Sequence, residues 1–121
     1  YNDGFVLPAA IDRETVVAIG PAEGQQVTAI AADFGEDRDV FALDQAIEPV
    51  KAEWANYVRG MAQAMLAEGM PLVGAQMAIA GDVPLGSGLS SSAALEIAVG
   101  SALAGLSGIS VEPTRLAQIA Q

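Results

Sequence analysis

The sequence contains no cysteine and no histidine, and cationic side chains are few. A disulfide framework is therefore excluded, and the commonest zinc ligands and the cysteine and histidine members of nucleophilic triads are missing. Five lysines and arginines are set against fifteen aspartates and glutamates, which gives a formal net charge of -10. Because a protein needs a basic surface to displace counterions from nucleic acid, we expect no nucleic-acid partner.

Long hydrophobic runs are also missing. The longest uncharged run, residues 97–111, contains three glycines and is shorter than the roughly 18 apolar residues that a membrane-spanning helix needs. No basic amino-terminal region or cleavage site resembles a secretory signal. These absences predict a protein without a membrane segment, located in the cytoplasm.

The composition that is present is typical of a packed globular domain, with 52% hydrophobic and 17% charged residues. The 121 residues suffice for one small domain and not for two. The chain begins with Tyr1 rather than methionine, and residues 112–121 have the pattern of a helix that stops short. We therefore expect this chain to be a portion of a larger protein.

The hydrophobic pattern predicts an α+β fold. Short apolar, β-branched runs predict four antiparallel strands at residues 4–12, 14–20, 26–34 and 40–44. Pro21 and Gly24 predict a hairpin turn between the second and the third of these strands. After the strands we expect a helix within residues 48–71, a strand at 73–84, a helix from about Ser91 to Ala104 and another helix behind Pro113.

Four acidic residues, Asp33, Glu36, Asp37 and Asp39, gather near the expected turn between the third and fourth strands. Carboxylates grouped in this way are candidate ligands for a metal ion. In a turn between strands, however, such a run is more commonly solvated. We interpret it as a solvated loop.

The stretch PLGSGLSSSAALEIA places glycines and serines directly before an apolar helix. Gly86 and Gly88 permit positive φ and a close approach of the backbone to a ligand. Ser90, Ser91 and Ser92 stand at the start of the helix, where free amides and the positive end of the helix dipole favour an anion. Their hydroxyls can donate to phosphate oxygens or coordinate a magnesium ion that bridges them. A triphosphate could therefore be held here without a lysine.

A flexible linker and an ordinary serine N-cap are the plainer interpretations of this stretch. A linker would be solvated on both sides, whereas this stretch lies between an apolar strand and an alanine-rich helix. An N-cap uses one serine and leaves the other serines and the paired glycines unexplained, so the residues favour an anion site. The stretch is not a Walker A loop, because no Gly-Lys-Ser/Thr follows, and not a dinucleotide fingerprint, because Ser91 replaces the third glycine.

Three segments resemble the galactokinase branch of the GHMP small-molecule kinases, a family that also includes homoserine kinase and mevalonate kinase. PLGSGLSSSAALE resembles the family's second motif, YNDGFVLPAAID resembles the end of the galactokinase signature, and WANYVRG resembles a galactokinase helix between them. The three segments lie in the expected order and span nearly the whole chain. The resemblance implies that residues 1–121 are an incomplete GHMP kinase N-terminal, ATP-binding domain with the α+β fold of ribosomal protein S5 domain 2.

The resemblance also implies ATP- and magnesium-dependent transfer of the γ-phosphoryl group to the anomeric hydroxyl of α-D-galactose. The implied nucleotide loop consists of Gly86, Ser87, Gly88, Leu89, Ser90, Ser91 and Ser92, with Ser92 as the implied magnesium ligand. Trp54 and Tyr57 lie three residues apart, and so on one helical face, and are implied to border the adenine. Without the resemblance we would interpret both aromatic residues as core anchors.

The catalytic residues of the family match no position of this chain. In the family, the arginine that assists transfer and the Glu-His-x-Asp residues that bind the sugar come before the tyrosine that Tyr1 matches. The family's magnesium-binding glutamate and catalytic aspartate come after the helix that Gln121 interrupts. Asp3, Asp12 and Glu96 do not replace them, and Glu96 is expected in the first turn of its helix for structural reasons. We therefore expect the chain to be inactive alone and to need the rest of its parent polypeptide.

Two other functions stay open. Regulatory relatives of galactokinase bind sugar and ATP without catalysis, and the intact Ser92-Ala93 pair favours an enzyme over such a sensor. A kinase of a related sugar, such as N-acetylgalactosamine, is the alternative among enzymes. The YNDG stretch favours galactose.

Overall fold

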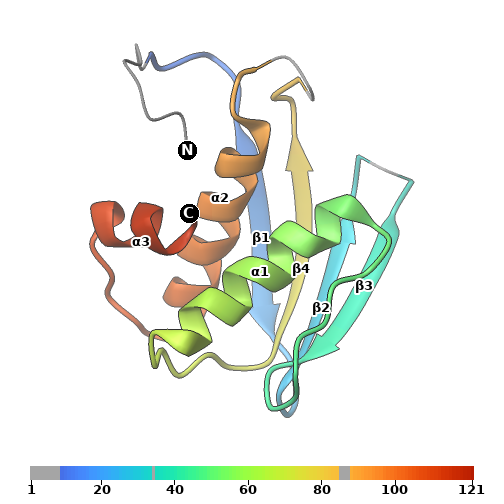
Figure 1. Cartoon of the computed structure of the whole chain (residues 1–121). Helices are drawn as coiled ribbons and strands as arrows, with labels where there is room; N and C mark the ends of the chain where they lie inside the picture. Colours follow the sequence, from blue (N-terminus) through green and yellow to red (C-terminus); the bar gives the residue numbers. More distant parts are fainter. Residues whose placement is uncertain (1–8, 34, 85–87) are drawn as a thin grey trace.

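The computed structural model describes residues 9–33, 35–84 and 88–121. Within these residues four strands form one sheet, and α1 and α2 lie across one of its faces (Figure 1). The elements in chain order are β1 (Thr15–Pro21), β2 (Gln26–Ala31), β3 (Asp37–Ala42), α1 (Glu53–Ala67), β4 (Ala75–Gly81), α2 (Ser91–Leu106) and α3 (Pro113–Ile119). The predicted α+β class and the three predicted helices are confirmed. None of the helices in the described residues has the length and apolarity that a bilayer span requires.

The sheet has the order β1-β4-β2-β3. β4 pairs antiparallel with β1 and parallel with β2, while β2 and β3 form an antiparallel hairpin. The prediction of four antiparallel strands before the first helix is therefore wrong. Residues 9–12 of the first predicted strand are not in a strand, and residues 4–8 lie outside the described residues. The fourth strand of the sheet is β4, which follows α1 along the chain.

The hairpin predicted between β1 and β2 is also wrong, because β4 lies between these two strands. Ala75 of β4 pairs with Pro21 on one side and with Val27 on the other. The connection from β1 to β2 passes close to Gly74, where an added Cβ would lie 2.4 Å from the carbonyl oxygen of Gly24. Turn residues indicate where a chain reverses, but they do not indicate which strand becomes its neighbour.

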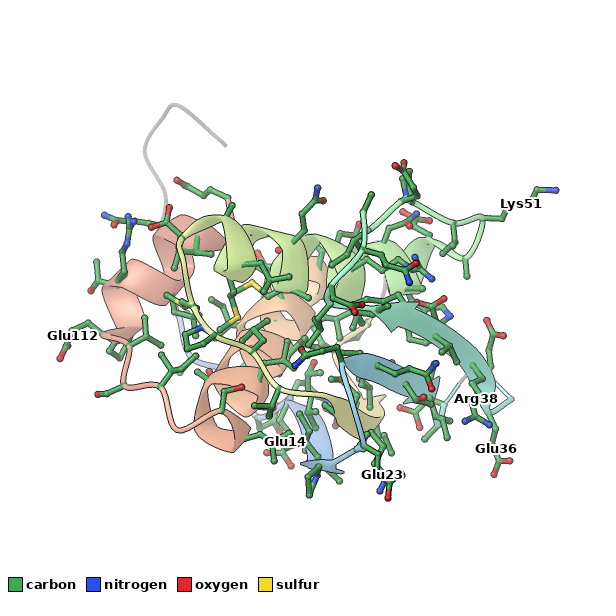
Figure 2. The ribbon with its side chains drawn as sticks, turned by 90° about the horizontal axis from the view of Figure 1, so that it is seen from below. Glu14, Glu23, Glu36, Arg38, Lys51 and Glu112 are labelled. Atoms are coloured by element: carbon green, nitrogen blue, oxygen red, sulfur yellow. The ribbon has the colours of Figure 1, made fainter. Side chains whose placement is uncertain are left out.

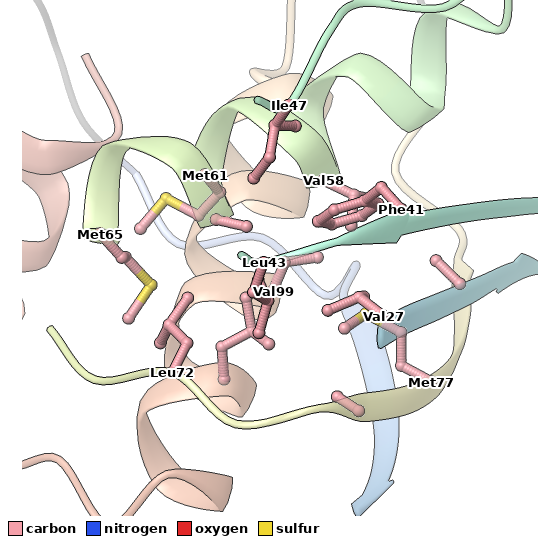
Figure 3. Packing of buried hydrophobic residues seen from close by; sticks show 14 of the residues in the cluster. Val27, Phe41, Leu43, Ile47, Val58, Met61, Met65, Leu72, Met77 and Val99 are labelled. Carbon is pink, nitrogen blue, oxygen red and sulfur yellow. The ribbon is translucent and has the colours of Figure 1, made fainter. Parts of the chain in front are cut away.

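α1 has the spacing of an amphipathic helix with one buried face. Its buried residues are Ala55, Val58, Met61, Ala62 and Met65. All of these except Ala55 pack in a core cluster with residues of β2, β3, β4 and α2, part of which is shown in Figure 3. α2 approaches α1 closely at Gly100, where a Cβ would lie 2.4 Å from Met61 Cε. The core therefore lies between the helices and the covered face of the sheet.

A nearly buried ion pair fastens α1 to β3. The side chains of Arg59 and Asp39 are 12% and 11% exposed, and Nε and Nη2 of the guanidinium each donate to one carboxylate oxygen at 2.8 Å. The same guanidinium donates to the carbonyls of Glu48 and Val40 at 2.9 and 3.0 Å. It also lies 5.0 Å from the ring centroid of Phe41, within the range of a cation–π contact. These contacts hold the middle of α1, and the segment that precedes the helix at Glu48, against β3.

The interpretation of the acidic cluster as a solvated loop is wrong in part. Glu36 fits it, since this residue is exposed with a left-handed φ of 59° and its side chain points outward near Arg38 (Figure 2). Asp37 and Asp39 instead belong to β3, and Asp39 is buried. Asp33 accepts a backbone hydrogen bond from β4. Three of these acids therefore act as acceptors that join the hairpin to its neighbours.

Candidate functional site

α2 begins with an unusual backbone at residues 88–92, which we call the helix entry. Gly88 has φ of 74°, and Ser90, the N-cap, has left-handed φ and ψ of 59° and 41°. Ser90 makes no side-chain capping hydrogen bond, so the plain serine N-cap interpretation is wrong. Gly86 and Ser87 lie outside the described residues.

The helix entry presents main-chain donors. The first hydrogen bond of α2 runs from the amide of Ala94 to the carbonyl of Ser90 at 3.0 Å. The amides before Ala94, at the first turn, are those that an α-helix leaves without an intrahelical partner. A left-handed residue that is not glycine costs about 1–2 kcal/mol, and such strain is typical of ligand-binding segments. This geometry suits an anion, because the donors lie at the positive end of the helix dipole.

A cavity of about 110 Å³ lies beside the helix entry, and we call it the tryptophan cavity. It is lined by Thr15, Ala31, Asp33, Trp54, Ile79, Ala80, Gly81, Val83, Ser91 and Leu95. These residues come from or adjoin β1, β2, β4, α1 and α2, so segments far apart in the sequence meet here. The lining is mostly apolar, and the cavity is smaller than the about 300–1,000 Å³ of a site that encloses a drug-sized ligand. It therefore suits one aromatic ring rather than a whole nucleotide.

The structure places two of the candidate residues, Trp54 and Ser91, on the wall of this one cavity. Of the described candidates, Tyr57 and Ser92 are half-buried and do not line it. Leu89, which precedes the N-cap Ser90, is 46% exposed. The cavity and the helix entry are thus adjacent through Ser91, while contact of these residues with a nucleotide stays a prediction.

Trp54 is the second residue of α1, and it is both a wall of the cavity and a contact of the core cluster. Its indole Nε1–H donates to Oδ2 of Asp37 at 3.0 Å. The other oxygen, Oδ1, accepts the backbone N–H of Arg38 at 3.0 Å. The two interpretations of this tryptophan, core anchor and pocket wall, are therefore compatible.

Asp33 lines the candidate site and Asp37 contacts its tryptophan, and the sequence pattern revealed neither relation. Oδ2 of Asp33 accepts the backbone N–H of Gly81 at 2.6 Å and so ties the end of β2 to the end of β4. Asp33 also lines the tryptophan cavity. An aspartate just beyond the last residue of an apolar strand was the available signal, because its short side chain can accept from a neighbouring backbone. The partner strand, however, could not be read from the sequence.

Asp82, the first residue after β4, anchors the beginning of the loop that leads to the helix entry. Its Oδ1 accepts the backbone N–H of Glu14 at 2.9 Å, its Oδ2 accepts from Arg13 Nη1 at 3.0 Å, and its own amide donates to the Glu14 carbonyl at 3.1 Å. The Glu14 amide first, and the Arg13 guanidinium next, hold the pKa of Asp82 below its usual value. The start of β1 thereby holds the chain that leaves β4.

Glu96 lies in the second turn of α2, not in the first, because the helix begins at Ser91. The expectation that it lies at the positive end of the helix dipole is therefore wrong. Burial raises the pKa of the Glu96 carboxyl above its usual value. Across the described part of the chain, acidic residues form no group of three or more that could hold a metal ion.

A sequence model of the GHMP kinases N terminal domain matches residues 56–121, more than half of this chain. The chain belongs to the GHMP kinase family. A second sequence model, the galactokinase galactose-binding signature, matches residues 1–21 of this GHMP kinase chain. The family resemblance inferred from the sequence motifs is thus confirmed.

Two curated relatives are named galactokinase. The protein from Chloroflexus aurantiacus is 48% identical over 121 residues, and that from Chloroflexus aggregans is 47% identical over 121 residues. Each match covers 100% of this GHMP kinase chain and 31% of the relative. The chain therefore spans about a third of the length of these relatives.

Solved structures confirm the GHMP kinase fold. The Lactococcus lactis galactokinase complexed with galactose superposes with a TM-score of 0.86 at 32% identity, covering 93% of this chain and 30% of that one. The Methanococcus jannaschii mevalonate kinase superposes with a TM-score of 0.73 at 17% identity, covering 86% of this chain and 34% of that one. The second likeness shows the fold alone.

Proposed function

We propose that residues 1–121 are part of the N-terminal, ATP-binding domain of a galactokinase. This enzyme would transfer the γ-phosphoryl group of ATP to the anomeric hydroxyl of α-D-galactose and yield galactose 1-phosphate. The observation that carries the proposal is the left-handed helix entry beside the tryptophan cavity, in a chain 48% identical to a galactokinase. The match of residues 1–21 to a galactose-binding signature supports galactose as the sugar.

In this proposal the adenine ring enters the tryptophan cavity and the phosphates lie at the helix entry. Trp54 forms the cavity wall. Tyr57 lies one turn further along α1 and does not line the cavity, so in this proposal it borders only the part of the base that stays outside the cavity. The proposed phosphate contacts are Gly86, Ser87, Gly88, Leu89, Ser90, Ser91 and Ser92. The small volume of the cavity supports this division, because it has room for the base and leaves the charged phosphates outside, near the amides of α2.

The residues at the helix entry fit a magnesium ion that arrives with the nucleotide. Magnesium keeps several waters and is commonly bound by one or two protein ligands together with substrate phosphates, so a large carboxylate cage is not needed. We propose the hydroxyl of Ser92, in the first turn of α2, as the ligand from this chain. When bound, the ion would neutralise charge on the phosphates.

Phosphoryl transfer depends on positioning and charge stabilisation by groups from several parts of a kinase. This chain would contribute the nucleotide site and no catalytic base, so we propose that it is inactive without the remainder of its parent polypeptide. The cytoplasmic location also stays a prediction.

The test is a phosphorylation assay on the full parent polypeptide, with ATP and either galactose or N-acetylgalactosamine. We expect ATP-dependent formation of galactose 1-phosphate and a lower kcat/KM with the acetylated sugar. Binding of galactose and ATP without turnover would instead indicate a sensor. Preference for N-acetylgalactosamine would indicate a kinase of that sugar, and turnover by the 121 residues alone would contradict the proposed inactivity.

Ser92→Ala tests the helix entry within the same assay. We expect kcat/KM to fall on the order of tenfold or more, because a metal ligand is lost. Ser101→Ala is a matched control, since Ser101 is an exposed serine of the same helix. Equal activity of the two variants would exclude Ser92 as a ligand.

A further inference from the structure

The hydrogen bond between Trp54 and Asp37 joins the wall of the tryptophan cavity to the β2–β3 hairpin. Trp54 is the only tryptophan in the chain, and its ring lies at the second position of α1. The N-cap of α1, Ala52, provides no side-chain hydrogen bond that could order this helix start. The 3.0 Å bond from Nε1 to Asp37 Oδ2 is therefore a contact from outside the helix that orients the indole.

Asp37 is itself well placed to hold the ring. It is the first residue of β3, and it pairs with Ala31, which also lines the cavity. Its Oδ1 accepts the amide of the next residue, Arg38, at 3.0 Å, which leaves Oδ2 directed to the indole. Each carboxylate oxygen thus accepts a hydrogen bond, and one of the two bonds ties the side chain to the backbone of its own strand.

This bond is poorly suited to a stabilising role. Asp37 is exposed, and a solvent-accessible hydrogen bond contributes little to folding, since water can replace either partner. The Arg59–Asp39 ion pair already fastens the same two elements, and both of its side chains are nearly buried. What the Trp54–Asp37 bond adds is the orientation of the ring that forms the cavity wall. An aromatic ring binds a flat ligand best at a defined plane and distance, so its orientation affects affinity.

We infer that Asp37 is a positioning residue that holds the Trp54 indole in the plane needed to bind the adenine ring. The inference rests on the nucleotide site proposed above. It assigns Asp37 no contact with substrate, and it predicts an effect on nucleotide affinity rather than on the chemical step.

Three variants of the full parent polypeptide separate the possible causes. Asp37→Ala removes the acceptor and one negative charge. Glu36→Gln removes one negative charge from the neighbouring, exposed position and leaves the bond intact, so it controls for electrostatics. Trp54→Phe keeps a ring but has no N–H donor, so the bond is absent with or without Asp37.

The first measurement is the indole N–H signal in a ¹⁵N-correlated NMR spectrum, assigned by its loss in Trp54→Phe. We expect this signal to shift and to exchange faster with solvent in Asp37→Ala, and to be unchanged in Glu36→Gln. The second measurement is the Kd for Mg-ADP by calorimetry and the KM for ATP. Asp37→Ala should raise both about three- to tenfold, the effect expected of one hydrogen bond, with kcat unchanged.

The double variant supplies the decisive comparison. If Asp37 acts through the indole, adding Asp37→Ala to Trp54→Phe should change the Kd no further. The inference is overturned if Asp37→Ala binds Mg-ADP like the wild type, if Glu36→Gln weakens binding equally, or if the two substitutions add. A wild-type protein that binds no adenine nucleotide would instead overturn the proposed function, and the inference with it.

Discussion

Replacing Arg59 with methionine tests the ion pair that fastens α1 to β3. The substitution removes two bonds of 2.8 Å to Asp39 and two bonds to main-chain carbonyls, and it leaves the nearly buried Asp39 carboxylate without its cation. Breaking a buried ion pair from one side costs about 3–5 kcal/mol. Methionine retains part of the packing on Phe41, so we expect a loss within this range rather than above it. That is a large share of the about 5–15 kcal/mol of a typical domain.

Urea unfolding followed by far-UV circular dichroism measures this loss. Arg38→Met is the matched control, because Arg38 is an exposed arginine of β3, the strand that carries Asp39. We expect this variant to change the unfolding free energy by no more than about 0.5 kcal/mol. The double variant Asp39→Asn/Arg59→Met removes the stranded charge and should recover part of the stability. A loss below about 1 kcal/mol in Arg59→Met, or a double variant no more stable than it, would refute the reasoning.

Three further predictions concern close packing and pH. Gly74→Ala should lower the free energy of unfolding by at least the upper part of the about 1–3 kcal/mol typical of overpacking, because its Cβ would meet a backbone oxygen. Gly100→Ala should lower it less, because its Cβ would meet the movable end of Met61 and because alanine favours a helix. Urea unfolding of the two variants and the wild type measures the difference. Because folding lowers the pKa of Asp82, its ionised carboxylate stabilises the fold fully above the unfolded-state pKa of 3.8, and this stabilisation is lost as pH falls through the folded-state pKa. The difference in unfolding free energy between the wild type and Asp82→Asn should therefore narrow below pH 3.8. Because folding raises the pKa of Glu96, ionisation of this carboxyl destabilises the fold as pH rises through the folded-state pKa. Glu96→Gln should therefore have a higher unfolding free energy than the wild type at pH 7, and this difference should disappear below pH 4.5.

The helices could be predicted from the sequence because their signals are local. α1 repeats apolar residues every three or four positions and is followed by Gly69, and α3 carries Pro113 at its first position. The motif at the start of α2 was recognisable for the same reason, since its glycines and serines are consecutive. Sequence patterns alone therefore sufficed to indicate the family, and they also point to the segment in which we propose the nucleotide site.

The sheet order could not be predicted, because it depends on contacts between distant residues. The turn at Gly24 looks the same whether β1 and β2 are neighbours or are separated by β4. The same limit hid Asp33 and Asp37, whose charges suggested solvent while their partners, Gly81 and Trp54, lie on other elements. Sequence patterns indicate what a side chain can bind, and the topology decides what it meets.

The arrangement of charge explains why a phosphate site in this chain would depend on its backbone. Within the part of the chain that the structure describes, three cationic side chains already pair with carboxylates, Arg13 with Asp82, Arg59 with Asp39 and Arg115 with Glu68. The net charge of -10 repels a polyanion at long range, although salt screens that repulsion beyond about 8 Å at physiological ionic strength. At contact distance the amides of a helix start retain their partial positive charge whatever the surrounding side chains carry. Ser90 has a left-handed backbone and makes no side-chain capping bond, and an anion site in so acidic a chain would depend on the main-chain amides of the turn that follows it.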